Sequence, residues 1–429
     1  MASRADLWRT AYYAGYSSAT LPVSDIDFTA LTHIVHFSLL PNGDGTLNPS
    51  TNAITPQGTA ELVSGAHAAN KQVLICIGGA GSYFPNAAST ANVASFVSNL
   101  TNFMASGGYD GIDVDWEPLP DGDGLLYTNL IFKLRAALDG FSTHKLLISA
   151  VPPSVSPGIV GAVQDKLDQI NLMTYDLSGP YAGWVTWFNS PIYDSGYVFP
   201  SVTNELVPSI EGSVNQFVTS GIPANKLGIG LAFYGYVWYG GFDGTSDGMR
   251  TPRESWTIAP TNYTRTYNQI VSSNFSANQF YYDAIAQAAW IGVDGGGTND
   301  MFISYDDARA CQSKVSYARN RGLGGLILWE ITQDHTPGQP DPLLQAVKQA
   351  LATPGTLAIQ PAGQNMNLSF TSAPLGSYRV QWNTNLAGNT WNSLLVTNLS
   401  LTVTGGVIQV TDPGFADKPL RFYRVQTPP

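Results

Sequence analysis

The stretch G-Y-D-G-I-D-V-D-W-E-P, Gly108–Pro118, places four acidic residues within eight positions of a chain in which only 12% of the 429 residues are charged. Apolar and acidic residues alternate along it, which predicts a β-strand with Asp113, Asp115 and Glu117 on one face. Such side chains lie about 6–7 Å apart, so three carboxylates there repel one another. Because this repulsion destabilises the strand, we expect the three carboxylates to have a chemical role.

Length and composition predict a large folded chain with more than one domain. The chain is 44% hydrophobic and 11% aromatic, which is enough for a large core. Its net charge of −11 and the lack of a Lys/Arg cluster argue against nucleic acid or an anionic membrane as partner. No apolar run reaches the ~18–20 residues of a membrane span. Cys76 and Cys311 make no disulfide framework, and we expect both to be free.

Short apolar runs alternate with helix-like segments, which is the pattern of strands and helices around a parallel sheet. The runs begin at Thr10, His33, Lys71, Gly111, Lys145, Gln169, Lys226 and Gly324. Residues 91–105 and 125–138 show apolar residues near helical spacing. Eight such units predict an α/β fold, a TIM (β/α)8 barrel, with its site at the C-terminal ends of the strands. A doubly wound sheet fits less well because no G-x-G-x-x-G follows a strand.

One connection is too long for a simple barrel loop. About 70 residues separate the seventh strand, ending at Gly235, from a helix expected near Tyr305, whereas such loops usually have about 2–6 residues. We interpret residues 236–303 as an inserted α+β subdomain on the catalytic face.

The composition changes after the last barrel helix. Residues 1–352 are expected to form the barrel domain and 353–357 a linker. Short alternating segments in 358–429 predict a small, sandwich-like all-β module of unknown family. Trp382 and Trp391 fit either a sugar-binding surface or the core of this module.

The acidic strand and further motifs along the chain resemble glycoside hydrolase family 18, the chitinases and their relatives. D-G-I-D-V-D-W-E matches the family's D-x-x-D-x-D-x-E signature, which ends at Glu117. Further matches, in the family's order, are C-I-G-G at 76–79, M-T-Y-D at 173–176, F-Y-G at 233–235 and W-E-I-T-Q-D at 329–334. The resemblance covers residues 8–352. It departs from the family at Cys76, where Ser is usual, and at His36–Ser38, so no contact from the second strand is assigned.

The resemblance implies substrate-assisted cleavage, in which the substrate's own 2-acetamido carbonyl is the nucleophile. Glu117 would be the general acid and later the base that activates water. Asp115 would accept a hydrogen bond from the acetamido N–H. Asp113 would share a proton with Asp115, because two buried carboxylates in contact cannot both ionise cheaply. Tyr175 would hydrogen-bond the acetamido oxygen, and the repulsion along the strand would keep one acid protonated.

The resemblance also implies substrate-binding residues around the carboxylates. Trp329 would be the floor on which the sugar stacks, and Asp176 would contact the sugar or the surroundings of the aspartates. Met173 and Tyr234 would line the same pocket, and Tyr12 would lie beneath the aspartates. Four loop tryptophans near the expected mouth fit either sugar platforms or structural cover: Trp184, Trp187, Trp238 and Trp256.

We expect neither a cofactor nor a metal. The acidic segment does not fit a calcium loop, because the sixth position requires Gly and is Pro118 here. The five histidines show no metal-ligand spacing.

Three functions remain open from the sequence. The first is a secreted, retaining chitinase that binds and hydrolyses chitin or N-acetylglucosamine oligosaccharides. The second is an endo-β-N-acetylglucosaminidase acting on N-glycan cores, although the inserted subdomain favours a walled groove for a linear chain. The third is a non-catalytic, lectin-like relative, which the presence of Glu117 opposes because such relatives typically lose this acid.

We expect a monomer that works outside the cell. The first residues, M-A-S-R-A-D-L-W, lack the apolar core of a signal peptide. Two interpretations follow. Either the protein is cytosolic, or a start Met has replaced a signal peptide. An extracellular polymer as substrate favours the second interpretation.

Overall fold

The computed structural model describes the chain in eleven stretches. They are residues 7–200, 205–242, 248–273, 275–339, 341–351, 358–362, 365–371, 378–384, 391–397, 407–412 and 421–426. The chain divides into two compact units, 1–344 and 345–429, and the division falls inside helix α9, Pro342–Leu351. The linker expected at 353–357 lies outside the described residues, so that domain boundary stays a prediction.

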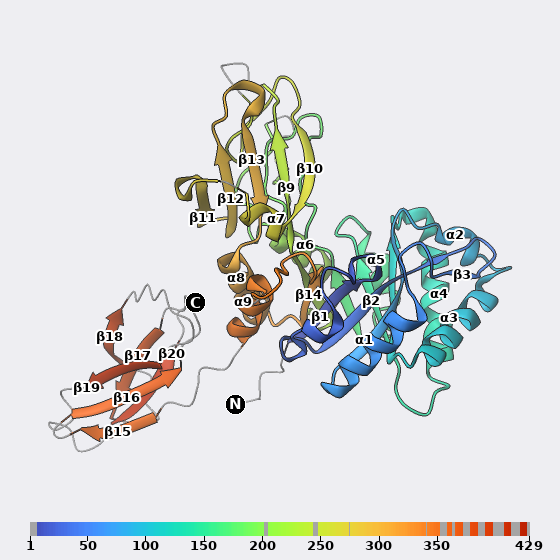
Figure 1. Ribbon diagram of the computed structural model, residues 1–429, viewed down its shortest axis with the longest axis horizontal. Helices are drawn as coiled ribbons and strands as arrows, with labels where there is room; N and C mark the ends of the chain where they lie inside the picture. The colour runs from blue at the N-terminus through green and yellow to red at the C-terminus, as the bar shows by residue number, and fades with distance from the viewer. Residues whose placement is uncertain are drawn as a thin grey trace. The chain divides into compact units, whose positions relative to one another are not determined.

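Parallel strands close a barrel in the first unit, which confirms the predicted fold class (Figure 1). The eight strands are β1 Trp8–Ala14, β2 His33–Pro41, β4 Gln72–Ala80, β5 Gly111–Glu117, β6 Leu146–Val151, β7 Gln169–Leu172, β8 Leu227–Ala232 and β14 Gly325–Trp329. They pair in this order, and β14 pairs with β1 to complete the ring. The short β3, Leu47–Asn48, adds antiparallel to β2. All eight predicted strands are present, although β7 ends at Leu172 where the predicted run extends to Asp176.

Helices alternate with the barrel strands. In the first unit they are α1 Pro56–Ala68, α2 Phe84–Ala87, α3 Val93–Gly107, α4 Gly124–Leu138, α5 Pro157–Gly161, α6 Ile210–Thr219, α7 Tyr267–Val271 and α8 Ala308–Asn320. Thr55 caps α1 by accepting the N–H of Gly58 at 3.0 Å, and Gly108 ends α3 in the left-handed conformation. The predicted helices at 91–105 and 125–138 correspond to α3 and α4. Among the described helices, none has the length and apolarity needed to cross a membrane.

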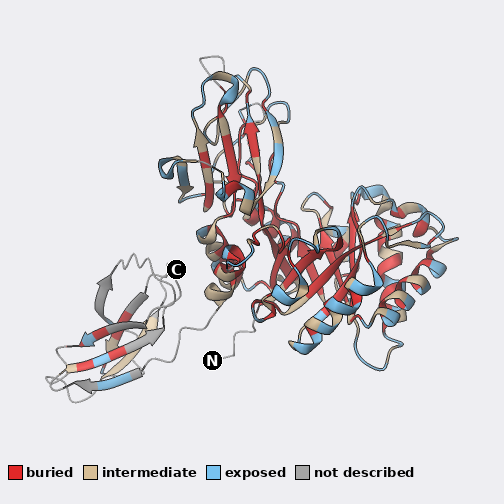
Figure 2. Ribbon diagram, viewed as in Figure 1, coloured by how far each residue is buried: buried red, intermediate tan, exposed pale blue. Residues whose placement is uncertain are grey.

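The core lies inside the barrel and between the strands and their helices (Figure 2). Tyr12, Val35, Leu74, Ile148 and Ile327 are buried within the barrel. The strands are rich in Val, Ile and Leu because both of their faces are covered. Cys76 and Cys311 are both buried and free, as expected.

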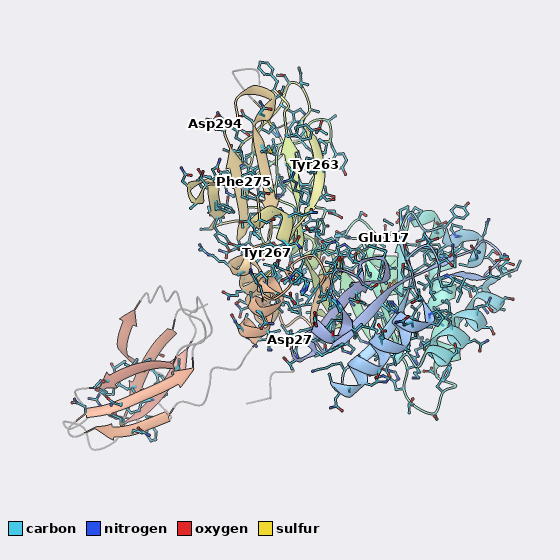
Figure 3. All side chains as sticks on the ribbon, in the orientation of Figure 1. Asp27, Glu117, Tyr263, Tyr267, Phe275 and Asp294 are labelled. Carbon is cyan, nitrogen blue, oxygen red and sulfur yellow. The ribbon has the colours of Figure 1, made fainter. Side chains whose placement is uncertain are left out.

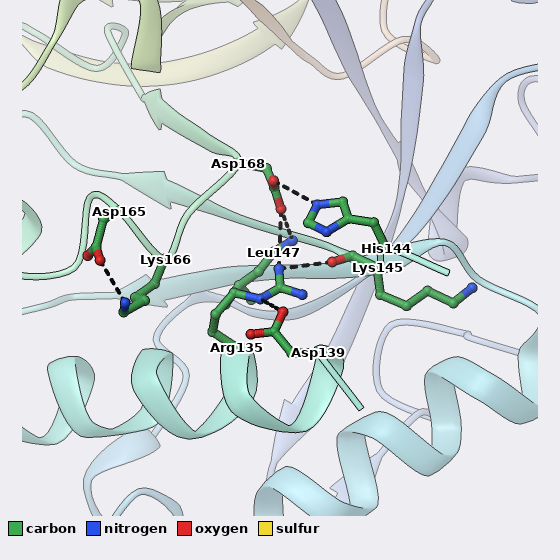
Figure 4. A network of polar contacts seen from close by, with 8 residues as sticks. All are labelled: Arg135, Asp139, His144, Lys145, Leu147, Asp165, Lys166 and Asp168. Carbon is green, nitrogen blue, oxygen red and sulfur yellow. Dashed lines mark hydrogen bonds and ion pairs between the residues drawn. The ribbon is translucent and has the colours of Figure 1, made fainter. Parts of the chain in front are cut away.

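A polar network closes the end of the barrel where strands β6 and β7 begin (Figure 4). Arg135 of α4 donates to Asp139 at 2.7 Å and to the carbonyl of Lys145 at 2.9 Å. Asp168 accepts the N–H of Leu147 at 2.8 Å. Because this network lies at the N-terminal ends of the strands, we assign it to stability and not to catalysis.

An antiparallel sheet is inserted between β8 and α8, in the order β10-β9-β13-β12-β11. Its strands are β9 Tyr234–Tyr239, β10 Thr261–Thr266, β11 Phe280–Asp283, β12 Ala288–Val293 and β13 Met301–Tyr305. The sheet extends beyond the predicted range 236–303 at both ends, since β9 begins at Tyr234, directly after β8, and β13 ends at Tyr305. Tyr305, expected near the start of a helix, ends β13 instead. Helix α8 starts at Ala308, where the side chain of Asp307 caps it.

After α9, the described part of the second unit consists of antiparallel strands, as the sequence predicts. Two sheets, β15-β16-β19 and β18-β17-β20, are formed by β15 Ala358–Ala362, β16 Asn365–Thr371, β17 Tyr378–Asn383, β18 Asn392–Thr397, β19 Val407–Asp412 and β20 Phe422–Gln426. The guanidinium of Arg421 lies 4.0 Å from the ring centroid of Trp382 and pairs with the buried Asp412. Arg424 lies 4.2 Å from the ring centroid of Trp391. This packing favours a structural role for Trp382.

Candidate active site

Strand β5 carries its three carboxyl groups in one row on the inner face of the barrel. Asp113 and Asp115 are buried, and Glu117, the last residue of the strand, is partly exposed. Figure 3 labels Glu117 among the side chains of the barrel. The alternate residues pack outward, where the ring of Trp116 stacks on Phe84 at 4.5 Å between centroids. The period-two pattern in the sequence therefore separates the reactive face of this strand from its packing face.

Asp113, the deepest carboxyl group, has two polar neighbours. The hydroxyl of Tyr12 donates to Asp113 Oδ2 at 2.9 Å, and the buried Cys76 lies beside Asp113 on the neighbouring strand β4. Burial raises the pKa of Asp113 to about 7, and its interactions with Tyr12 and Cys76 limit the rise. Tyr12 thus lies beneath the aspartates, where the sequence places it. Cys76, although it departs from the family's Ser, still places a thiol there.

Asp115 lies between the other two carboxyl groups of the row. Burial raises the pKa of Asp115 well above its ordinary value, and the charges of Glu117 and Asp113 add to the rise. Burial also raises the pKa of Glu117, which a hydrogen bond with Asp115 opposes. A hydrogen bond between two carboxyl groups needs one proton. The expectation that Asp113 and Asp115 share a proton stays a prediction.

Gly78 on β4 allows the neighbouring strand to approach this row. Its φ of +123° is unfavourable for other residues, and a Cβ atom there would lie 1.9 Å from the carbonyl oxygen of Asp115. Glycine is therefore required for close strand packing beside Asp115.

Tyr175 faces the carboxyl row from the segment that follows β7. Burial raises the pKa of its hydroxyl, and the negative charges of Glu117 and Asp115 raise it further. Gly230 of β8 makes room for the ring, since a Cβ atom there would lie 2.6 Å from Tyr175. The phenol therefore remains protonated and able to donate a hydrogen bond across the site.

Asp176 adopts a left-handed backbone conformation, with φ of +57°. Its Oδ1 accepts the hydroxyl of Tyr234 at 2.5 Å, and Tyr236 is hydrogen-bonded to the same carboxylate. Burial raises the pKa of Asp176, and these two hydrogen bonds oppose the rise. Because both tyrosines belong to β9, the inserted sheet supplies part of the site. Tyr236 was not predicted from the sequence.

An aromatic cluster lies beside the carboxyl row at the end of β14. The ring of Trp329 lies 4.7 Å from Phe37 and 5.3 Å from Tyr12 between centroids, and Met173 is buried in the same cluster. Phe37 is the contact from the second strand that the sequence left unassigned. Its inward position two residues after Val35 is the signal that would have revealed it.

Space for a substrate opens beside Glu117. A cleft of about 550 Å³ is lined by Ala80, Gly81, Glu117, Pro118, Leu119, Pro120, Asp121, Pro152 and Ser154. No group of three or more His, Cys, Asp and Glu within the described residues is arranged to hold a metal ion. The groups that the site does offer are carboxyl and phenol groups next to an aromatic surface.

Comparison with known proteins assigns the family. The profile described as "Glycosyl hydrolases family 18" matches residues 9–334. The chain belongs to glycosyl hydrolase family 18. It is therefore a glycoside hydrolase of the chitinase type, as the motifs along its barrel strands predict.

Two curated relatives and one solved structure illustrate the similarity. Endochitinase 1 of Metarhizium robertsii is 28% identical over 310 residues, which cover 67% of this chain and 67% of that protein. The class V chitinase of Arabidopsis thaliana is 28% identical over 370 residues, covering 80% and 90%. The class V chitinase from Nicotiana tobaccum, solved as a Glu-to-Gln mutant in complex with NAG4, aligns with a TM-score of 0.65 at 24% identity, covering 81% and 99%. That last similarity shows the fold.

The tryptophans near the mouth of this family 18 enzyme pack mostly as structural cover. Trp187 and Trp238 are fully buried in a cluster with Phe302 of the inserted sheet. Trp184 and Trp256 lie partly buried against the same cluster. The structural interpretation is therefore the better one for Trp187 and Trp238.

A buried hydrogen bond to the side chain of Asn189 holds the Tyr175–Asp176 segment in place. Asn189 Oδ1 accepts the N–H of Asp176 at 2.8 Å, and its own N–H donates to Ser304 Oγ of β13 at 2.7 Å. Both Asn189 and Ser304 are buried. The unusual backbone of Asp176 is thus fixed by a side chain that is itself fixed by the inserted sheet.

A second buried contact holds the same segment from the side of α8. Ser190 Oγ donates to the carbonyl of Thr174 at 2.6 Å and accepts from Lys314 Nζ at 2.6 Å. Lys314 also forms an ion pair with Asp306, and both side chains are buried. Sequence reasoning missed these residues, because nothing in the local pattern places 189–190 beside residue 314.

Asn189→Ala should lower kcat about 10–100-fold, since a small displacement of Asp176 and Tyr175 misaligns the reacting groups. The unpaired N–H of Asp176 should also lower the free energy of unfolding by about 1–3 kcal/mol. Steady-state kinetics and denaturant unfolding measure the two effects, with the exposed Asn102→Ala on α3 as control. A loss of stability with unchanged kcat would limit Asn189 to a structural role.

Proposed function

We propose that this family 18 enzyme hydrolyses β-1,4-linked N-acetylglucosamine polymers and oligomers with retention of configuration. The observation that carries the proposal is the placement of Asp115 and Glu117 at the C-terminal end of β5, with the buried phenol of Tyr175 near both carboxyl groups. The two carboxyl groups offer a transferable proton and an acceptor for an amide N–H, whereas Tyr175 offers a donor for an amide carbonyl. These are the contacts that an acetamido sugar needs in order to act as its own nucleophile. The chitinase relatives and the NAG4-bound neighbour support the same substrate class.

In the proposed reaction, the sugar to be cleaved lies on the partly exposed ring of Trp329. Glu117 gives its proton to the glycosidic oxygen while the acetamido oxygen, oriented by Tyr175, attacks the anomeric carbon from the opposite face. The bond to the leaving group breaks, and a cyclic oxazolinium ion forms with its N–H on Asp115. Glu117, now a carboxylate, takes a proton from water, which attacks the same carbon and opens the ring.

We further propose that the enzyme acts outside the cell and as a monomer. A polymer such as chitin is too large to reach an enzyme inside a cell. The net charge of −11 favours a neutral or cationic partner over an anionic one.

The first product should be the β-anomer, because two inversions at the anomeric carbon restore its configuration. Proton NMR of a chitin oligomer during the first minutes of hydrolysis resolves the two anomers. An initial α-anomer would refute the double displacement. If chitin oligomers are not cleaved but an N-linked glycopeptide is, the endo-β-N-acetylglucosaminidase alternative replaces the proposal.

Glu117→Gln should lower kcat by about 10²–10⁴ while oligosaccharide binding persists, because the amide keeps the shape of Glu117 but has no proton to transfer. Turnover of a chitin oligomer and calorimetric binding measure the two properties. Glu61→Gln, at an exposed position of α1, is the matched control. Near-normal turnover in a folded Glu117→Gln variant contradicts the assigned acid.

Asp176→Asn should move the alkaline limb of kcat/KM to lower pH. The charge of Asp176 raises the pKa of Glu117, and the acid must be protonated to act. Removing that charge lowers the pKa of Glu117, so the acid loses its proton at a lower pH than in the wild type. The experiment measures the pH at which kcat/KM declines. The maximum of kcat/KM is not used, because it also falls when Asp176 no longer helps to bind the substrate. A limb that stays in place would show that Asp176 does not act on Glu117 electrostatically.

A further inference from the structure

The cleft beside Glu117 lies on the leaving-group side of the site. Its lining comes from the segments that end or follow β4, β5 and β6. It includes none of the residues that form the bed of the reacting sugar, namely Tyr12, Met173, Tyr175 and Trp329. An acid that protonates the glycosidic oxygen stands between the reacting sugar and the leaving group. The unit beyond Glu117 therefore enters this cleft.

The lining of the cleft differs in kind from the aromatic bed of the reacting sugar. Pro118, Pro120 and Pro152 give it rigid walls, and Ala80 and Gly81 leave room. Among its nine lining residues there is no aromatic ring and no basic side chain. The sugar unit on the leaving-group side is therefore held by the shape of the cleft and by a charge on the cleft wall, and not by stacking on an aromatic ring.

Asp121 supplies that charge. It begins a short 3₁₀ turn, Asp121–Asp123, and its carboxylate is exposed and has no hydrogen-bond or ion-pair partner among the described residues. Glu117 is the only other acidic residue that lines the cleft. While Glu117 holds the proton for catalysis, Asp121 is the one negative charge at the wall. A cationic group on the leaving unit would therefore be attracted.

We propose that this cleft binds an amino sugar with a free, protonated amine, and that the enzyme prefers to cleave bonds whose leaving unit is glucosamine. Its substrate class is then partly deacetylated chitin, with N-acetylglucosamine required on the reacting side, where the acetamido group attacks. The inference rests on the proposed function and adds the selectivity of the leaving-group side. An exposed ion pair of this kind changes a rate by about two- to fivefold.

The test is digestion of a partly N-acetylated chitosan in mildly acidic buffer, followed by mass-spectrometric sequencing of the new chain ends. For the wild type, glucosamine should be enriched at new non-reducing ends, and new reducing ends should be N-acetylglucosamine. Asp121→Asn should lower the enrichment about two- to fivefold, and the rate of the same variant on fully acetylated oligomers is measured beside it. Asp123→Asn, two residues away and outside the lining, is the matched control. Added salt should weaken the wild-type enrichment, because it screens exposed charges.

Each outcome decides the inference. New non-reducing ends that match the composition of the polymer overturn it, and so does an enrichment that Asp121→Asn leaves unchanged. Enrichment that survives high salt assigns the selectivity to shape and overturns the role of charge. If neither chitosan nor fully acetylated oligomers are cleaved, the proposed function fails, which is a different result from loss of selectivity in an active enzyme.

Discussion

Burial of three carboxyl groups on one face of β5 is the constraint on which the rest of the site depends. An isolated ionised carboxylate is costly in an apolar interior, so each group must be protonated, hydrogen-bonded or paired. Tyr12 donates to Asp113, and Asp115 and Glu117 share a hydrogen bond. One oxygen each of Asp113 and Asp115 is nevertheless buried without a hydrogen-bond partner, which adds to the preference of these groups for the protonated form.

The inserted sheet is part of this arrangement and not a separate wall beside it. Tyr234 and Tyr236 of β9 hold the carboxylate of Asp176, and Ser304 of β13 holds Asn189, which in turn fixes the backbone of Asp176. Removing residues 236–303 would remove Tyr236 and most of the two strands that carry Tyr234 and Ser304, so groups that orient the site would be lost. The sequence predicts a subdomain on the catalytic face but not these contacts, because the alternation that reveals a strand does not reveal which distant residues it touches.

The sequence predicts the strands and the reactive row well, because both are local. Period-two alternation gives β5, and Val/Ile/Leu runs bounded by helical segments give the other barrel strands. Contacts between distant positions are not visible in such patterns. The hydrogen bond from Tyr12 to Asp113 joins residues about a hundred positions apart, and Asn189 acquires its role only where β13 packs beside it. The start of α8 was missed because residues 301–305 continue a strand that only the inserted sheet can reveal.

Raised proton affinity and stabilisation of a cation are linked in the proposed reaction. Burial raises the pKa values of Asp113, Asp115, Glu117 and Asp176, so each of these carboxyl groups holds a proton more strongly than an exposed one does. The oxazolinium ion brings a positive charge into contact with Asp115, which favours the ionised form of that carboxyl group. Negative charge then develops beside the intermediate as the intermediate forms. A row of carboxylates that was already fully ionised would bind cations in the resting enzyme and would stabilise the transition state less selectively.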